Sequence, residues 1–180
     1  MLGCKPKGRL TEQHDIFFGI ANSLKELVPK MLAFWPEANG IMHIDAWREI
    51  TMVDGYTIEV VAKNSLPRSS ALFFINLGGY KPNEFEEYHY KLLTVAPAMA
   101  AAIRKSKTTV FYKHFGFEGA VSHVDDKYGI DMDDAYNVED ILGTLGNQYS
   151  LQLSEGPNMQ EDVLHIGYLQ IAKLLKDGSQ

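Results

Sequence analysis

Hydrophobic and polar residues alternate from Ile41 to Ile50, a pattern typical of a strand with one covered face. One predicted face is apolar and comprises Met42, Ile44, Ala46 and Ile50. The other face carries His43, Asp45, Trp47 and Glu49. Asp54-Gly55 then predicts a tight hairpin into a second strand from Tyr56 to Val61. Two apolar runs, Ala71 to Leu77 and Tyr149 to Ser154, predict further strands.

Apolar residues at helical spacing predict a helix between Thr11, a suitable N-cap, and Pro29, which ends or bends it. Its apolar stripe comprises Ile16, Ile20, Leu24, Leu27 and Val28. A second helix is predicted to open at residues 82–86, with Asn83 as N-cap, and to kink or restart at Pro97. Residues 163–175 fit either a strand or a helix, and we favour the strand.

The chain repeats itself. The segment from His43 to Glu59 returns from His123 to Glu139 at an offset of 80, with seven identities in 17 residues. Upstream, Leu2-Gly3 and Glu12-x-His14 return as Leu77-Gly78 and Glu87-x-His89 at an offset of 75. We interpret this pattern as a tandem duplication.

The duplication predicts an α+β fold in which two βαββ units share one mixed sheet, with the helices mainly on one face and a pseudo-twofold axis. Copy one would span residues 1–63 and copy two 71–142, with a linker at 62–70, and 143–180 would form a C-terminal extension. The hairpin turn of copy two is expected within Asp131 to Ala135. Only Met1 precedes Leu2, so we expect a truncated or misassigned start rather than a missing first strand.

The composition is that of a globular protein, with 46% apolar and 22% charged residues in a chain of 180. The net charge of -6 argues against nucleic-acid binding. No apolar run approaches the ~20 residues of a membrane span, and the N-terminus has no signal-peptide pattern. The single cysteine, Cys4, excludes an intrachain disulfide, which favours a reducing cytoplasm.

The first candidate site is the basic loop from Gly3 to Arg9, which contains Lys5, Lys7 and Arg9. It is predicted to join a strand to a helix N-terminus, where free N–H groups and the helix dipole attract anions. Copy two offers only Lys81 at this place, so a single anion site is expected. The alternative is a solvated basic turn. Cys4, beside two of these lysines, is a weaker candidate nucleophile.

The second group of candidates is histidines. His14 and His89 are predicted in first helical turns, where the i, i+2 spacing would separate them from Glu12 and Glu87 and exclude two-ligand binding. The pairs His43-x-Asp45 and His123-x-Asp125 would each lie on one strand face. Such a pair orients a base, or binds a metal if other donors join it; the alternative is a buried polar ladder. The available donors are Glu49, His14, His89, His114 and His165. We assign no metal and no cofactor from the sequence.

Three stretches, residues 2–15, 43–49 and 122–129, resemble the domain-of-unknown-function family 1543. This small, mainly bacterial family carries its domain in one or two copies per chain, so the resemblance implies a two-copy arrangement. It implies no activity and assigns no catalytic residue.

Three functions therefore remain open. We favour a binding or interaction module whose basic loop takes a small anionic ligand. The alternative is a small hydrolase or isomerase that uses His14, His43 or His123 with Asp45 or Asp125. The third is a structural subunit of an assembly, and a homodimer is compatible with the sequence. Convergence of His14, His43 and Asp45 in a concave pocket would favour the enzyme, and buried, mutually hydrogen-bonded His-x-Asp pairs would speak against it.

Overall fold

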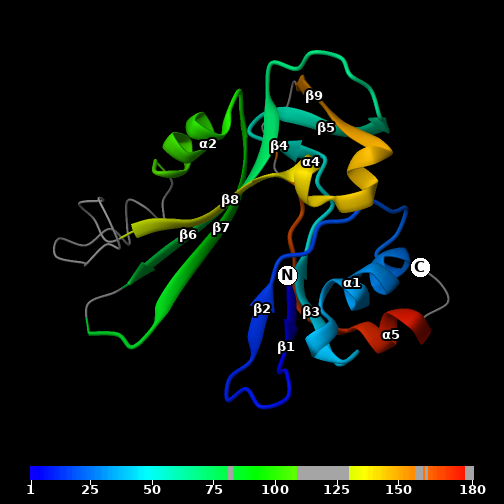
Figure 1. Cartoon of the computed structure of the whole chain (residues 1–180), viewed down its shortest axis with the longest axis vertical. Coiled ribbons are helices and arrows are strands. Elements are labelled where there is room, and N and C mark those ends of the chain that lie inside the picture. The colour runs from blue at the N-terminus through cyan, green and yellow to red at the C-terminus, as the bar shows by residue number, and fades with distance from the viewer. Residues whose placement is uncertain (81–82, 109–129, 157–159, 161, 177–180) are drawn as a thin grey trace. The chain divides into compact units, whose positions relative to one another are not determined.

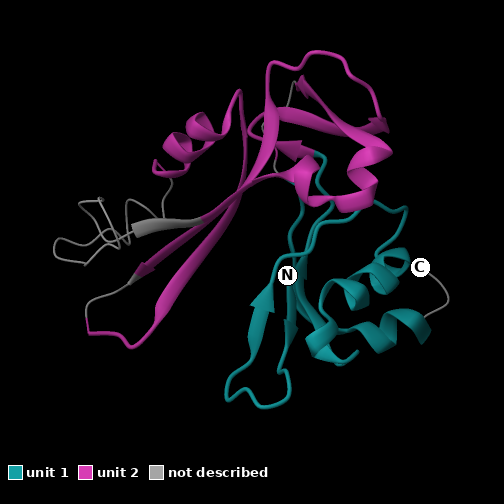
Figure 2. Ribbon diagram, in the orientation of Figure 1, with its two compact units in different colours: residues 1–51, 162–180 teal, residues 52–161 magenta. Residues whose placement is uncertain are grey.

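A computed structural model describes residues 1–80, 83–108, 130–156, 160 and 162–176. The chain forms two compact units, one of residues 1–51 and 162–180 and the other of residues 52–161 (Figure 2). The fold is α+β, as predicted. The predicted single mixed sheet is wrong, because the described strands form three separate sheets in which all pairs are antiparallel.

The first unit contains a four-stranded sheet covered by short helices (Figure 1). Its strands, in spatial order, are β10 (His165–Gln170), β3 (His43–Trp47), β1 (Leu2–Cys4) and β2 (Gln13–Asp15). Its helices are η1 (Lys25–Leu27), α1 (Val28–Phe34), η2 (Pro36–Ala38) and α5 (Ile171–Lys176). Val28 and Met31 of α1 and Ile171 of α5 pack with Leu2 and Ile44 in one apolar core. The sheet therefore buries one face and leaves the other for polar side chains.

The helix predicted between Thr11 and Pro29 is wrong over most of its length. Residues 13–15 form β2, which pairs with β1, and no helix is found before Lys25. Pro29 stands in the first turn of α1 instead of ending a helix. Proline is tolerated there because the first helical N–H groups have no intrahelical partner.

The second unit contains two three-stranded sheets. One consists of β4 (Met52–Val53), β5 (Tyr56–Ala62) and β9 (Tyr149–Glu155). The other consists of β7 (Glu87–Ala96), β6 (Ala71–Tyr80) and β8 (Ile130–Asn137). The helices are α2 (Met99–Ser106), α4 (Val138–Ile141) and η3 (Gly143–Asn147). A core of Phe73, Ile75, Leu77, Ala96 and Ala102 joins α2 to the β6–β7 hairpin.

Strand pairing overrides the local helix signals in this unit. The helix predicted from residues 82–86 is wrong, because β7 pairs with β6 along ten residues and Asn83 adopts a left-handed φ of 64°. A helix does restart after Pro97, at Met99. The turn predicted within Asp131 to Ala135 is also wrong: β8 runs through it, and its register shifts opposite Asn76 and Leu77.

Other strand predictions are confirmed. Asp54 and Gly55, with φ of 55° and 80°, form the hairpin turn between β4 and β5. Residues 163–175, for which a strand or a helix was predicted, contain both: the strand β10 ends at Gln170 and the helix α5 begins at Ile171. No helix among the described residues has the length and apolar content required to cross a membrane.

The two halves of the sequence repeat show one similarity in register. Gly3 pairs with His14 across β1 and β2, and Gly78 pairs with His89 across β6 and β7. The compact units do not follow the repeat boundaries, because residues 162–180 join the N-terminal unit. The duplication itself, with its pseudo-twofold axis, stays a prediction.

Candidate functional site

A row of three residues crosses the polar face of the first sheet. Gly3 of β1 lies opposite His14 of β2 on one side and opposite His43 of β3 on the other. Directly opposed residues in an antiparallel sheet share a face. Leu2 and Cys4, the neighbours of Gly3, point into the apolar core. The two histidines therefore flank a glycine on the face away from the helices.

Gly3 lets the two histidines meet. Strands lie about 4.8 Å apart, so β2 and β3 are separated by roughly 10 Å across β1. The ligand atoms of His14, His43 and Glu12 nevertheless lie within 4.8 Å of one another. A Cβ at position 3 would come within 2.5 Å of both His43 Nε2 and Asp45 Oδ2. The space above Gly3 is thus filled by the side chains of the site, and only glycine leaves room for them.

Each carboxylate contacts both imidazoles. Glu12 places Oε2 3.6 Å from His14 Nε2 and Oε1 3.3 Å from His43 Nε2. Asp45 places Oδ2 3.4 Å from His14 Nε2 and Oδ1 3.2 Å from His43 Nε2. We call these four residues the His/carboxylate cluster.

The cluster has a buried floor and an open rim. The side chain of His43 is 7% exposed and that of Asp45 is 22% exposed. The side chains of His14 and Glu12 are 40% and 47% exposed. A ligand would therefore approach from the side of β2.

One oxygen in the floor lacks a hydrogen-bond donor. Asp45 Oδ2 is buried, and within the described part of the chain no group donates a hydrogen bond to it. A buried carboxylate oxygen without a donor is unfavourable, because it has lost its water without replacement. His14 Nε2 lies 3.4 Å from this oxygen. The cluster thus contains a buried acceptor that a hydrogen-bond donor or a cation could satisfy.

The spacing of the donor atoms fits a transition-metal ion. Two ligands at 2.0–2.1 Å from a tetrahedral ion are separated by about 3.3 Å. The four contacts between imidazole and carboxylate in the cluster are 3.2–3.6 Å long. Imidazole nitrogen with carboxylate oxygen is a common ligand set for zinc and non-haem iron.

The structure brings together three of the predicted site residues, His14, His43 and Asp45. It adds Glu12, which the helix prediction had separated from His14. That prediction is wrong because the two residues lie at and just before a strand, where positions i and i+2 share a face.

Two of the other predicted donors, His165 and His89, do not join this cluster. His165 stacks on Trp47, with ring centroids 4.0 Å apart. His89 lies in the second unit, 4.0 Å from Glu87. His114, His123 and Asp125 lie outside the described residues.

The basic loop lies in a different setting from the predicted one. Lys5, Lys7 and Arg9 occupy the connection between β1 and β2, and the three residues are exposed. No helix begins there, so the argument from a helix N-terminus falls. The cations still belong to the same hairpin as Glu12 and His14.

Cys4 is not set up as a nucleophile. The residue is 2% exposed, and burial raises the pKa of its thiol. The negative charges of Glu12 and Glu37 raise it further. A reactive cysteine needs the opposite shift.

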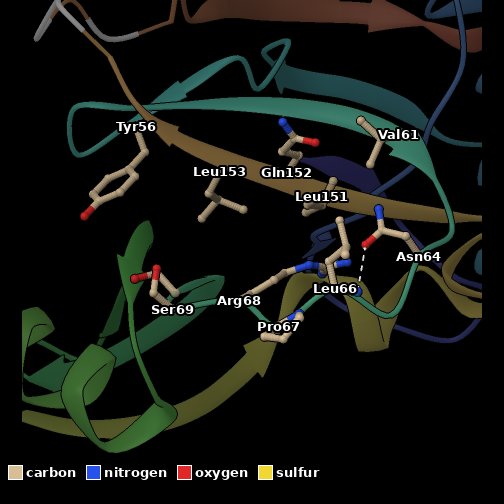
Figure 3. A pocket seen from close by; sticks show the side chains of 11 residues that line it. Tyr56, Val61, Asn64, Leu66, Pro67, Arg68, Ser69, Leu151, Gln152 and Leu153 are labelled. Carbon is tan, nitrogen blue, oxygen red and sulfur yellow. Dashed lines mark hydrogen bonds between the residues drawn. The ribbon is translucent and has the colours of Figure 1, made fainter.

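The second unit contains a cavity of about 280 Å³ between the β5–β9 pair and residues 64–70 (Figure 3). Arg68 is the charged residue of its lining, which also includes Tyr56 and Ser69. The guanidinium forms an ion pair with Glu139, whose Oε1 also accepts the Leu151 N–H at 2.6 Å. This ion pair compensates the charge of Arg68, so the cavity is a weaker candidate for a ligand site than the cluster.

Comparisons with known proteins show a similar fold and a resemblance to one family. The chain is similar to the crystal structure of a protein Il1583 from Idiomarina loihiensis, with a TM-score of 0.62 and 20% identity. The match covers 94% of this chain and 92% of that one, and at this identity it shows the fold alone. No curated protein matches the sequence. Residues 9–60, which include all four cluster residues, match the model of the family described as Domain of Unknown Function (DUF1543), so the predicted resemblance is confirmed.

Proposed function

We propose that this protein binds one divalent transition-metal ion through His14, His43 and one carboxylate, that of Glu12 or Asp45. The observation that carries the proposal is the convergence of two imidazoles and two carboxylates above Gly3, at spacings of 3.2–3.6 Å. The ligands come from the β1–β2 hairpin and from β3, whose positions the sheet fixes. Ligands on rigid strands suit a preformed site.

Electrostatics favour a cation at this place. Two ionised carboxylates within reach of the same imidazoles repel each other unless positive charge lies between them. A divalent ion would supply that charge and satisfy the buried Asp45 Oδ2. The competing account is that the histidines are protonated and the four residues form only an ion-pair network.

The open rim supports chemistry as well as binding. Catalytic metal sites use three protein ligands and keep one further position for water or substrate; here the exposed side chains of His14 and Glu12 are the side from which solvent would reach a bound ion. A bound ion of this kind lowers the pKa of its water towards neutrality and polarises carbonyl or phosphoryl groups. The proposed reaction class is therefore metal-assisted hydrolysis or isomerisation, within the enzyme alternative of the sequence analysis.

The basic loop supports a negatively charged substrate. Lys5, Lys7 and Arg9 are exposed on the hairpin whose second strand carries His14. Cations beside a metal site raise the local concentration of anions and speed their association. In this proposal the anion-binding role predicted for the loop becomes substrate recruitment.

The test of metal binding is a titration of the metal-free protein with Co²⁺, followed by visible absorption. We expect saturation at one ion per chain, and at least a tenfold loss of affinity in His14→Ala and in His43→Ala. His165→Ala, which removes a histidine of the same unit outside the cluster, should bind as the parent does. Equal binding by all four proteins, or no binding by the parent, would refute the site and leave the ion-pair network.

The test of catalysis uses chromogenic phosphate and carboxylate esters with the zinc-loaded protein. We expect turnover that a chelator abolishes and added Zn²⁺ restores. Arg9→Ala should raise KM for the anionic ester more than for a neutral one. Metal binding without turnover of any ester would reduce the proposal to a binding module.

A further inference from the structure

We propose that Tyr168 is a positioning residue that holds the imidazole of His43 in the orientation needed for metal binding. The inference rests on the proposed function. The two rings lie with centroids 4.3 Å apart and an interplanar angle of 35°. Tyr168 is 65% exposed, whereas His43 is buried. The phenol ring therefore forms an outer wall against one face of the buried imidazole.

A β-bulge places the tyrosine there. Ile166 pairs with Ala46 and Leu169 with Ile44, so two residues of β10, Gly167 and Tyr168, oppose Asp45 alone. Bulges of this kind re-aim side chains and are common beside functional sites. Gly167 adopts a φ of 145°, a conformation that other residues rarely adopt.

The strand alternation shows what the bulge achieves. Gln170 is the register partner of His43, so Tyr168, two residues away, lies on the face that carries the cluster. An unbulged strand would place Tyr168 on the face of Ile166, whose partner Ala46 does not share the face of Asp45. The extra residue thus brings the aromatic ring to the metal-binding face.

Stacking restricts the rotation of the imidazole. His43 directs Nε2 between Glu12 Oε1 at 3.3 Å and Asp45 Oδ1 at 3.2 Å. If the His43 imidazole could rotate freely about its side-chain torsions, Nε2 would not stay in this position. Partners that orient a metal-binding histidine without touching the metal change affinity by roughly 10–100-fold when removed.

The decisive variants are Tyr168→Phe and Tyr168→Ala, compared in the same Co²⁺ titration as the parent. Phenylalanine keeps the ring, so its affinity should stay within about twofold. Alanine should weaken binding about tenfold. Ile166→Ala, an exposed apolar change on the same strand, is the matched control and should bind normally. If the parent binds Co²⁺ and Tyr168→Ala binds equally well, the positioning role is overturned; if the parent does not bind, the proposed function fails first.

A second measurement does not need the metal. In NMR spectra of the metal-free protein, the ring protons of His43 should be shifted upfield by the Tyr168 ring current. The shift should persist in Tyr168→Phe and disappear in Tyr168→Ala, while the melting temperatures show that both variants are folded. An unchanged His43 spectrum in folded Tyr168→Ala would overturn the inference independently of any metal.

Discussion

At the scale of residues, the site depends on one position that has no side chain. Gly3 is flanked by His14 and His43, and the space that a Cβ would need is taken by His43 Nε2 and Asp45 Oδ2. The same strand turns Leu2 and Cys4 into the core. The short strand β1 thus has one face in the apolar core and the other at the His/carboxylate cluster.

Gly3→Ala should therefore weaken metal binding. The added methyl group would displace both side chains, lower the metal affinity at least tenfold, and destabilise the protein by about 1–3 kcal/mol through overpacking. Co²⁺ titration and urea denaturation measure the two effects. Gly40→Ala is the control, because Gly40 has a φ of 74° with open space around it. It should cost about 1–2 kcal/mol of stability and leave the metal affinity unchanged.

Cys4 gives a second prediction at this scale. Because burial and nearby negative charge raise the pKa of its thiol, the native protein should react slowly with a thiol reagent at pH 8. Reaction should become fast in denaturant. Rapid reaction of the native protein, matching that of the unfolded chain, would show that β1 is not packed as described.

Part of this residue pattern was predictable. The i, i+2 spacing of His43 and Asp45 on an alternating strand places both on one face, and the two do meet. Glu12 was missed because residues 11–28 also fit a helical period. The signal that favoured a strand was Glu12-x-His14 itself, since a strand places positions i and i+2 together. Tyr168 had no local signal, because its contact with His43 depends on a bulge.

At the scale of elements, Asp54 anchors the hairpin between β4 and β5. Its Oδ2 accepts hydrogen bonds from Thr94 Oγ1, the Val95 N–H and Lys105 Nζ, each at 2.7 Å. Burial alone would raise the pKa of Asp54, but these hydrogen bonds, led by that of Lys105, outweigh it and leave the pKa below its ordinary value. The residue therefore ties the turn to β7 and α2.

Asp54→Asn should lower the free energy of unfolding at pH 7 by about 1–2 kcal/mol, because hydrogen bonds to a charged acceptor are lost. The folded-state pKa is depressed, so the stabilisation is complete above the unfolded pKa of about 4 and is lost as the pH falls through the folded value. The stability difference between Asp54→Asn and the parent should therefore shrink as the pH falls below about 4. Urea denaturation between pH 7 and pH 3 measures it, with the exposed Asp140→Asn as control. A constant difference at all pH values would contradict this role.

Elements formed by short-range signals were predictable, and elements fixed by distant partners were not. Asp54-Gly55 specifies its own turn through left-handed dihedrals, and the hairpin forms there. The N-cap signal at Asn83 competes with ten paired residues of β6 and β7, and the pairing prevails. Each helix signal is worth about 1 kcal/mol, whereas the hairpin also buries a core.

At the scale of the whole molecule, the cluster belongs to one unit although its chain is discontinuous. Glu12, His14, His43 and Asp45 lie in residues 1–51, and Tyr168 comes from the C-terminal segment. Thr51 is bound to Asp162 by hydrogen bonds of 2.6 and 2.9 Å, which join the two segments where the second unit begins and ends. The repeat in sequence did not predict this division.

Metal should therefore stabilise the first unit selectively. At 100 times Kd a bound ligand adds about 2.7 kcal/mol. Amide hydrogen exchange should slow in β1 and β3 by up to about a hundredfold on adding Zn²⁺, and should change little in β6. Equal protection of β6 would show that the ion acts outside the cluster or that the units open together, and would contradict this assignment.

The central claim is that two histidines and one carboxylate above Gly3 bind a metal. Anomalous diffraction at the zinc absorption edge, from crystals grown with one equivalent of Zn²⁺, tests it most directly. The account predicts one strong peak about 2.0–2.1 Å from the Nε2 atoms of His14 and His43, with a carboxylate oxygen of Glu12 or Asp45 completing the set. A zinc peak elsewhere, or none at a cluster whose histidines remain paired with the carboxylates, would contradict the claim.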